Sequence, residues 1–380
     1  SVIFTATDDC GNVTTASANF TIEDTNAPDI TTQATDLNLE CDAVNQDAAI
    51  QTWLTANGNA IASDICGSIT WANDYAGLTD VCGETGTAIV IFTVTDDCGN
   101  ASQTTATVTV GDASAPDITA NATDTTVECD GAGNTAELNA WLSANANAAA
   151  TDICGGVTWS NDYTDNISDD CGATGAAIVT FTATDDCGNA STSSATFTII
   201  DNTAPEITTN ASDTTVECDG SGNTTELNDW LAANGNAVST DDCSNVTWSN
   251  DFTVLSDECG TTGAAIVIFT ATDDCGNNTS TTAQFIIIDT VDPSIDTAPQ
   301  DETVECDGTG NDAQFQAWLT ANGNAVATDD CGTITWTNDY NALTDECGAT
   351  GTTSVIFTAT DDCGNVTTAS ANFTIEDTNA

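Results

Sequence analysis

The stretch AIVTFTATDDCGNASTSSATFTII, residues 177–200, contains the pattern that decides the fold. Its first part, 177–184, is typical of a central strand, because apolar residues occupy both of its faces. The next five residues, 185–189, have the composition of a turn. In the last part, apolar residues such as Phe197 and Ile199 alternate with threonine, which predicts a half-buried strand. The stretch therefore predicts two strands joined by a tight turn.

The same pattern recurs along the chain at a fixed period. Four modules of 88, 89, 88 and 88 residues begin at Pro28, Pro116, Pro205 and Pro293, and residues 1–27 are identical to residues 354–380. Such a period is typical of an array of one structural unit. We therefore expect modules at 28–115, 116–204, 205–292 and 293–380, with 1–27 as the C-terminal part of a preceding module.

Outward from the two long strands, the rest of a module predicts more strands and one helix. In the second module, residues 118–129 and 157–159 have the composition of strands. Between them, Asn134 and Glu137 have the spacing of a helix capping box, and residues 138–142 carry one apolar helical stripe. We therefore expect a mostly β fold of tandem immunoglobulin-like β-sandwich modules, each with one short inserted α-helix and two disulfides.

The composition excludes several classes of function. The chain has 59 acidic residues and no Lys, Arg or His, which gives a net charge of −59 and excludes nucleic acid as a partner. No apolar run is long enough to insert this segment into a membrane. Paired acids such as Asp169 and Asp170 are chemically able to hydrolyse glycosides. However, the acidic pairs recur in every module and no segment is unique, so we expect no enzyme activity.

Seventeen cysteines supply four per module plus Cys10. Their spacing within a module is 25, then 16 or 17, then 16 residues. A regular, even number of cysteines in small domains predicts a disulfide framework in an oxidising compartment. A metal–thiolate site is disfavoured, because the chain has neither a C-x-x-C pair nor a histidine.

Strand length limits which cysteines pair. The strand predicted between Cys171 and Cys187 separates their Cα atoms by about 30 Å, far beyond the reach of a disulfide. Tracing the module places Cys154 and Cys187 at its N-terminal pole and Cys129 and Cys171 at the other. We therefore predict Cys129–Cys171 and Cys154–Cys187. The equivalent pairs are Cys41–Cys82, Cys66–Cys98, Cys218–Cys259, Cys243–Cys275, Cys306–Cys347 and Cys331–Cys363. Cys10 matches Cys98, so its partner is expected before residue 1.

The pattern FTATDDCGN at 181–189, with the module end IDNTAP at 200–205, resembles hyalin-repeat (HYR-like) immunoglobulin-type modules. It is similar in particular to the tandem repeats of giant surface adhesins of gliding and marine Bacteroidetes. The resemblance implies an exported, extracellular and very long repeat protein that acts as a stalk, adhesin or filament. The linker 201–205 is also similar to the joint between cadherin domains, where calcium lies between domains.

Carboxylates gather in the DDCGN turn and in the linker between modules, and they are candidate ligands for Ca²⁺ at the module boundaries. The alternative is that these residues only form turns, which Asp, Gly and Asn do without metal. The candidate metal ligands are Asp96, Asp97, Asn100, Asp112, Asp185, Asp186, Asn189, Asp201, Asp273, Asp274, Asp289, Asp361 and Asp362. Asp64, Asp152 and Asp241, which lie beside the second cysteine of their modules, are secondary candidates.

Each module contains two tryptophans, such as Trp141 and Trp159, and core packing is favoured over glycan binding for both. Taken together, the sequence predicts a calcium-bound, disulfide-stapled rod within a giant extracellular adhesin, at a cell surface or in a secreted filament. Its expected partners are neighbouring modules or other copies of itself, with surface glycans as a further candidate. Two other functions stay open, namely a self-assembling extracellular fibre subunit and a glycan-binding module array.

Overall fold

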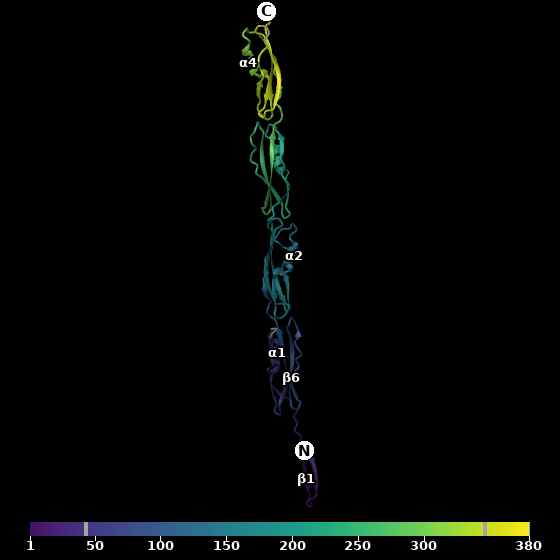
Figure 1. Ribbon diagram of the computed structural model, residues 1–380. Helices are drawn as coiled ribbons and strands as arrows, with labels where there is room; N and C mark the ends of the chain where they lie inside the picture. Colours follow the sequence, from purple (N-terminus) through teal and green to yellow (C-terminus); the bar gives the residue numbers. More distant parts are fainter. Residues whose placement is uncertain (42–44, 345–347, 380) are drawn as a thin grey trace. The chain divides into compact units, whose positions relative to one another are not determined.

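The computed structural model describes residues 1–41, 45–344 and 348–379. The four modules repeat one order of strands and helices along the chain (Figure 1). The chain consists of two compact units. Unit 1 contains Ser1–Val127, Asn134–Ser168 and Gly175–Ile199, and unit 2 contains Glu128–Gly133, Asp169–Thr174 and Ile200–Ala380.

The first half of each module contains two short strands, the helix and a third short strand. The first strands are β3 (Asp29–Thr32), β10 (Asp117–Ala120), β16 (Glu206–Thr209) and β22 (Ser294–Thr297). The second strands are β4 (Leu37–Glu40), β11 (Thr125–Glu128), β17 (Thr214–Glu217) and β23 (Glu302–Glu305). The helices are α1 (Gln46–Thr55), α2 (Thr135–Ser143), α3 (Thr224–Ala232) and α4 (Asp312–Thr320). The third strands are β5 (Ile61–Ser63), β12 (Ala149–Thr151), β18 (Val238–Thr240) and β24 (Val326–Thr328).

The second half of each module contains the two long strands. They are preceded by β6 (Ile69–Asn73), β13 (Val157–Asn161), β19 (Val246–Asn250) and β25 (Thr335–Asn338). The first long strands are β8 (Gly86–Asp96), β14 (Gly175–Asp185), β20 (Gly263–Asp273) and β26 (Gly351–Thr360). The second long strands are β9 (Ala101–Gly111), β15 (Ala190–Ile200), β21 (Asn278–Ile288) and β27 (Val366–Glu376).

Each module folds into a large and a small sheet. In the second module the large sheet has the order β11-β15-β14-β13, and β10 pairs with β12 in the small sheet. The long strands pair antiparallel, whereas the strand before the helix joins the sheet edge in parallel, as Val216 opposite Ile287 shows in the third module. In the first module, β7 (Thr79–Asp80) also pairs with β8. Residues 1–27 contribute only the hairpin of β1 (Val2–Thr7) and β2 (Val13–Ala18).

The helix packs against the inner face of the large sheet. In the third module, Trp230 from α3 lies edge-on against Phe269 of β20, with ring centroids 5.1 Å apart. Both side chains are buried, and the indole nitrogen of Trp230 donates to the carbonyl of Ser212 at 3.1 Å. This bond satisfies the buried N–H group. The predicted core role of the first tryptophan of each module agrees with this packing.

The helix begins at the predicted position, but its N-terminus is built differently from the predicted capping box. Asn134 and Asn223 precede α2 and α3 in the left-handed conformation, and neither side chain caps the helix. The Asn223 amide instead donates to the carbonyl of Glu217 at 2.9 Å, and its oxygen accepts from the backbone of Asp219 at 3.2 Å. The asparagine therefore ties the helix to the loop that precedes it.

The outer face of the large sheet is uncovered among the described residues. Ile178 of β14 is 77% exposed, whereas Val179 and Phe181 on the same strand are fully buried. The prediction that this strand is central is confirmed, since β14 lies between β15 and β13, but its outer face is not covered. The inner face, the helix and the small sheet together form the sandwich. The predicted fold class, tandem mostly β modules with one short helix each, is confirmed. No helix in the described ranges has the length and apolar character needed to cross a bilayer.

Candidate functional site: the module junctions

The disulfides join neighbouring modules instead of closing single modules. Six bonds lie within the described residues, with Cα–Cα distances between 5.1 and 6.1 Å. The first cysteine of a module bonds the second cysteine of the next module in Cys41–Cys154, Cys129–Cys243 and Cys218–Cys331. The third cysteine bonds the fourth cysteine of the next module in Cys82–Cys187, Cys171–Cys275 and Cys259–Cys363. The predicted pairing within modules was therefore wrong.

The predicted placement of the cysteines at the module poles is consistent with these bonds. Cys154 and Cys187 both bond the preceding module, and Cys129 and Cys171 both bond the following one. The two cysteines at each pole thus pair across the junction and not with each other. Four further cysteines have no disulfide among the described residues, namely Cys10, Cys66, Cys98 and Cys306. Cys347 lies outside the described residues, so the predicted pair Cys306–Cys347 is not assessed.

The second cysteine of a module is buried by the module before it. Cys154 is only 3% exposed and belongs to the same apolar cluster as Trp53 and Phe92 of the first module. Cys331 likewise belongs to the core cluster of the third module. Cys66, the equivalent residue of the first module, is exposed. The junctions after the first and the third module therefore extend the core of one module with a sulfur atom from the next.

Backbone atoms also meet at each junction. The residue two positions after the third cysteine donates to the carbonyl of the second cysteine of the next module. These bonds are Glu84 to Cys154 at 2.8 Å, Ala173 to Cys243 at 2.7 Å and Thr261 to Cys331 at 2.8 Å. The intervening glycine has positive φ, and a Cβ added there would overlap the same carbonyl oxygen. Only glycine fits such a close approach of two chain segments.

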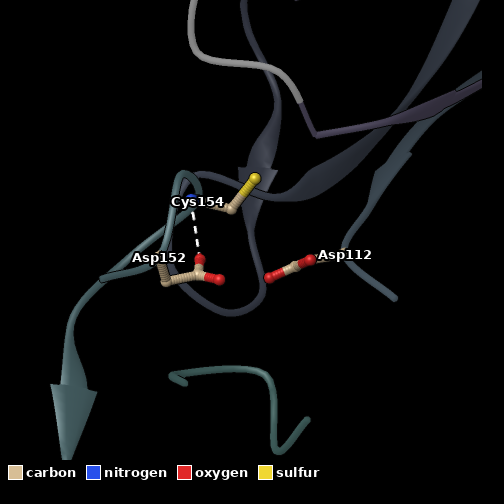
Figure 2. Close-up of side chains that lie close together, drawn as sticks. All are labelled: Asp112, Asp152 and Cys154. Atoms are coloured by element: carbon tan, nitrogen blue, oxygen red, sulfur yellow. Dashed lines mark hydrogen bonds between the residues drawn. The ribbon is translucent and has the colours of Figure 1, made fainter. Parts of the chain in front are cut away.

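Carboxylates meet beside the disulfides. At the junction of the first two modules, the linker residue Asp112 and the residue Asp152 face each other (Figure 2). Their carboxylate oxygens and the sulfur of Cys154 lie within 4.8 Å of one another. The sulfur is not free to bind metal as a thiolate, because it is in a disulfide. The equivalent pairs are Asp24 and Asp64 at the start of the first module, Asp201 and Asp241 at the next junction, and Asp289 and Asp329 at the last; Asp96 lies beside the first of these pairs.

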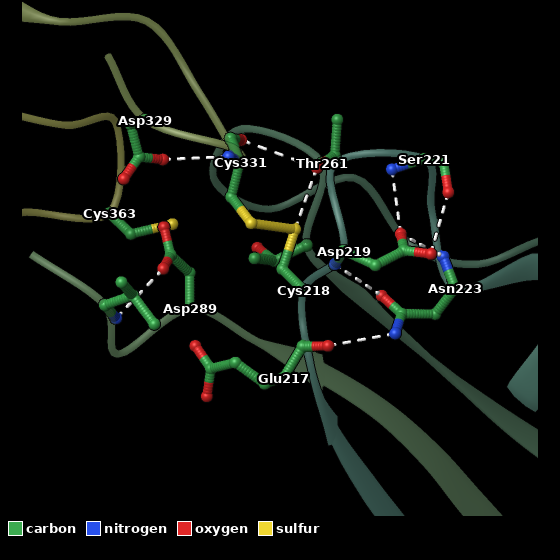
Figure 3. Close-up of a disulfide and its surroundings, with 12 residues drawn as sticks. Glu217, Cys218, Asp219, Ser221, Asn223, Thr261, Asp289, Asp329, Cys331 and Cys363 are labelled. Atoms are coloured by element: carbon green, nitrogen blue, oxygen red, sulfur yellow. Dashed lines mark hydrogen bonds between the residues drawn. A yellow bond between two sulfur atoms is a disulfide. The ribbon is translucent and has the colours of Figure 1, made fainter. Parts of the chain in front are cut away.

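Two of these carboxylates have a buried oxygen without a hydrogen-bond partner. One oxygen of Asp201 accepts from the backbone of Thr203 at 3.0 Å, whereas Oδ2 is buried and unpartnered. The Asp201 side chain is only 8% exposed and lines a cavity of about 170 Å³ together with Asp241. Asp289 repeats this arrangement next to the Cys218–Cys331 disulfide, with Asp329 on the same side (Figure 3). A buried carboxylate oxygen of this kind needs a cation, a proton or water.

The pKa values of the linker carboxylates Asp112 and Asp201 are raised, which means that their charged forms are destabilised. A bound cation would stabilise the charged forms. Burial raises the pKa of Asp201, and the negative charges of Asp241, Asp273 and Glu128 add to the shift. Burial likewise raises the pKa of Asp112, with a contribution from Asp152. The charged form is disfavoured in both cases, because it is desolvated and faces like charges.

The structure separates the two aspartates of each DDCGN turn. The first aspartate is buried and holds its own turn, as Asp185 does by accepting from the Asn189 side chain and backbone at 2.9 Å. Burial alone would raise the pKa of Asp185, but these hydrogen bonds lower it. Asn189 also donates to the carbonyl of Asp112 at 3.2 Å, which attaches the turn to the linker. The residues that act as Asp185 does are Asp96, Asp273 and Asp361, and the linked asparagines are Asn100, Asn277 and Asn365.

The second aspartate of the turn faces a loop of its own module. Asp186 accepts from the backbone of Gly156 at 2.8 Å. Among the described residues, its carboxylate does not belong to the cluster of Asp112 and Asp152. Its equivalents bond the same loop, Asp97 to Ser68, Asp274 to Asn245 and Asp362 to Thr333. The secondary candidates Asp64, Asp152 and Asp241 lie closer to the linker carboxylates than these residues do. Sequence spacing contained a signal for them, since each lies two positions before the second cysteine.

Comparison with known proteins gives a structural likeness alone. No family model matches the chain, and no curated protein matches it. The chain is similar to the protocadherin gamma B4 extracellular domain at 11% identity and a TM-score of 0.35, covering 99% of this chain and 77% of that one. It is also similar to Drosophila N-cadherin EC1-4 at 10% identity and a TM-score of 0.24, covering 91% of this chain and all of that one. The hyalin-repeat identification therefore stays a prediction.

We expect Gly260→Ala to weaken the junction that follows the third module by about 1–3 kcal/mol, because the new Cβ overlaps the Cys331 carbonyl. Gly348→Ala is the matched control, since Gly348 also has positive φ but has no atom within 4 Å of an added Cβ. Thermal unfolding of the full chain, with thiol labelling of Cys259 and Cys363, measures the difference. Equal melting and equal labelling of the two variants would contradict this role of Gly260.

Proposed function

We propose that this chain is a structural segment of a very long extracellular repeat protein, serving as the disulfide-stapled stalk or filament of a cell-surface adhesin. The observation that carries the proposal is the pair of disulfides at each junction between described modules. Bonds between modules add nothing to the closure of a single domain, but they fix each module to its neighbour. A repeated unit with repeated links is suited to supplying length and reach.

The cysteines support a location outside the cell. Disulfides persist in oxidising compartments and are reduced in most cytosolic environments. The third-to-fourth bonds are only half-buried at Cys171 and Cys275, so a reducing compartment would have access to them. Antibodies raised against the folded modules should label intact cells, and electron microscopy of the native material should show beaded extensions. Labelling that needs cell lysis would contradict the proposal.

We propose further that Ca²⁺ occupies the junctions. Asp201 and Asp289 each offer a buried, unpartnered oxygen, and Asp241 and Asp329 offer a second carboxylate in the same cavity. Oxygen ligands of this type suit Ca²⁺, which takes six to eight of them. Backbone carbonyls and water would complete the coordination. The chain has no Lys, Arg or His side chain to neutralise these groups at neutral pH, so a bound cation would do what an ion pair does in other proteins.

Calcium is expected to stabilise the chain through these sites. At about 100 times its dissociation constant, one bound ion adds roughly 2.7 kcal/mol to the free energy of unfolding. Asp201→Asn with Asp241→Asn should remove the gain at one junction, as measured by calorimetric titration and thermal unfolding. The matched control is Glu226→Gln with Asp229→Asn, which removes the same charge from the exposed face of α3. Equal calcium binding by both double variants would contradict the assignment.

The same carboxylates give a second readout in the presence of a chelator. Because burial raises the folded-state pKa of Asp201, the junction should gain stability as the pH falls from 7 through that raised value. Below about 3.8, carboxylates with lowered pKa, such as Asp185, lose their stabilising bonds and the trend reverses. Asp201→Asn should raise the stability at pH 7 without calcium and flatten the gain on acidification.

A self-assembling fibre is the second candidate function, and the uncovered sheet face favours it. Ile89, Ile178 and Ile266 occupy equivalent positions on the outer faces of β8, β14 and β20, and each is more than 70% exposed. A large apolar side chain repeated at the same exposed position offers one contact point per module to a second copy. Replacing all three by threonine should leave the melting temperature unchanged. If the native material forms ordered fibres that this variant cannot form, lateral assembly is the function.

A further inference from the structure

We propose that the disulfides of the third and fourth cysteines link one strand of each module into a continuous covalent path. Tension along the protein is borne by this path, so the modules do not have to unfold under load. The inference deepens the proposed structural role, because it assigns a mechanical property to the stalk. It follows from which cysteines pair and from which strand lies between them.

The line alternates strands and disulfides. In unit 1 it runs from Cys98 along β8 to Cys82, and across a disulfide to Cys187. It then follows β14 back to Cys171, which bonds Cys275. In unit 2 it continues along β20 to Cys259 and crosses to Cys363. Every step inside a module therefore uses the same element, the first long strand.

This strand is nearly taut in the folded module. Sixteen positions separate Cys259 from Cys275, and eleven residues of that segment already form β20. A strand rises by about 3.3 Å per residue, whereas a fully extended chain reaches about 3.3–3.6 Å per residue. Only the few residues on either side of the strand hold slack. A pull along the line thus gains little length, although the whole module contains 88 residues.

The first and second cysteines form a second covalent path, which is longer inside each module. Twenty-five positions separate Cys218 from Cys243, and this segment contains the helix α3. A helix rises by only about 1.5 Å per residue, so this segment lengthens when it is pulled straight. The sixteen-residue line therefore becomes tight first. The line from first to second cysteine becomes tight only after further extension.

The consequence is that tension does not have to pass through the module cores. In an array linked only through its main chain, force unravels one domain after another. Here the chain between Cys275 and Cys363, which includes β21 and the whole first half of the fourth module, is bridged by the short route through β20 and Cys259. Unfolding that bridged chain would release no length. Reduction of the disulfides converts this inextensible chain into an ordinary extensible one.

Single-molecule force spectroscopy on the full chain tests the inference. Cys98 is exposed and has no disulfide among the described residues, so it provides one attachment point, and the C-terminus provides the other. Cys10, Cys66, Cys306 and Cys347 are replaced by serine to make the attachment unique. Under non-reducing conditions the covalent route contains roughly 65 residues, so we expect a limit on the order of 230 Å and no unfolding steps. Under reducing conditions the same attachment points should reach on the order of 1000 Å.

A second variant keeps the test decisive. Replacing Cys129, Cys171, Cys243 and Cys275 by serine removes both bonds of one junction and should release about thirty additional residues, on the order of 110 Å, while the rest of the chain stays locked. Cys171→Ser with Cys275→Ser alone should add no length, because a route of similar length remains through Cys129–Cys243. Full module unfolding steps under non-reducing conditions would overturn the inference. That result would leave the extracellular location untouched, since surface labelling tests it separately. Conversely, a locked chain that is absent from the cell surface would overturn the proposed function and not this inference.

Discussion

Loss of the Cys171–Cys275 disulfide is expected to lower the free energy of unfolding of the two modules that it joins by about 4 kcal/mol. The bond closes a loop across a sequence separation of 104 residues, and long loops give the largest entropic stabilisation of the folded state. Even with Cys129–Cys243 intact, the remaining loop is still long enough for a loss of this size. Thermal and denaturant unfolding of the full chain under non-reducing conditions measures the effect.

The set of variants also distinguishes the two pairing schemes. Cys171→Ser and Cys275→Ser remove the same bond, so the double variant should be no less stable than either single variant. If the cysteines paired within modules, the two substitutions would break different bonds and their losses would add. Cys98→Ser is the control, because Cys98 has the same place in its module as Cys275 but no disulfide among the described residues. Its melting temperature should not change.

The strands of the module were predictable because burial alternates along them. Phe197 and Ile199 are buried and lie on the inner face of β15, as their alternation with threonine predicts. The apolar run that contains Ile178 predicted a central strand, but it does not show which of the two faces of that strand is covered. The sequence contains no sign of what covers an outer face, so an exposed isoleucine and a buried one look alike.

The pairing of the cysteines could not be predicted from the sequence for a related reason. Strand length correctly separates Cys171 from Cys187 and places each at a pole. At a pole, however, two arrangements satisfy the same geometry, one within the module and one across the junction. Which pairing forms depends on how closely the next module approaches. The residue that shows this close approach is the glycine after the third cysteine. Gly172 has φ of 57°, and an added Cβ there would overlap the Cys243 carbonyl. No prediction was made from this glycine, because a glycine after a cysteine is equally typical of an ordinary turn.

The carboxylate cluster was predicted in part for the same reason. Asp112 and Asp201 were assigned to the boundary because they lie in the linker, and the structure places them beside a second carboxylate. That carboxylate is Asp152 or Asp241. Each directly follows the third short strand of the next module and lies two positions before its second cysteine, which the disulfide holds at the junction. Asp186 was expected there from its position in the turn. Successive residues of a turn point in different directions, and its side chain bonds a loop of its own module.

Phe269→Ala is expected to destabilise the third module by about 3–5 kcal/mol, an effect as large as the loss of a junction disulfide. Phe269 is fully buried, and its ring contacts Trp230 of α3. It also lies beneath the turn after the helix, where a Cβ added at Gly235 would come within 3.0 Å of the ring. Truncation therefore opens a cavity between the helix and the sheet. Ile266→Ala is the control on the same strand, since Ile266 is 71% exposed and should change stability by less than about 0.5 kcal/mol.

Hydrogen exchange measured by mass spectrometry locates the effect within the array. A loss of 3–5 kcal/mol corresponds to roughly a hundred- to several-thousand-fold faster exchange in the core strands β20 and β21. The equivalent strands β8 and β9 of the first module should keep their protection, because each module has its own apolar cluster around its own phenylalanine. Equal acceleration in all modules would contradict independent cores. It would mean that the disulfides between modules couple the whole chain into one cooperative unit, so that weakening one core lowers the stability of every other.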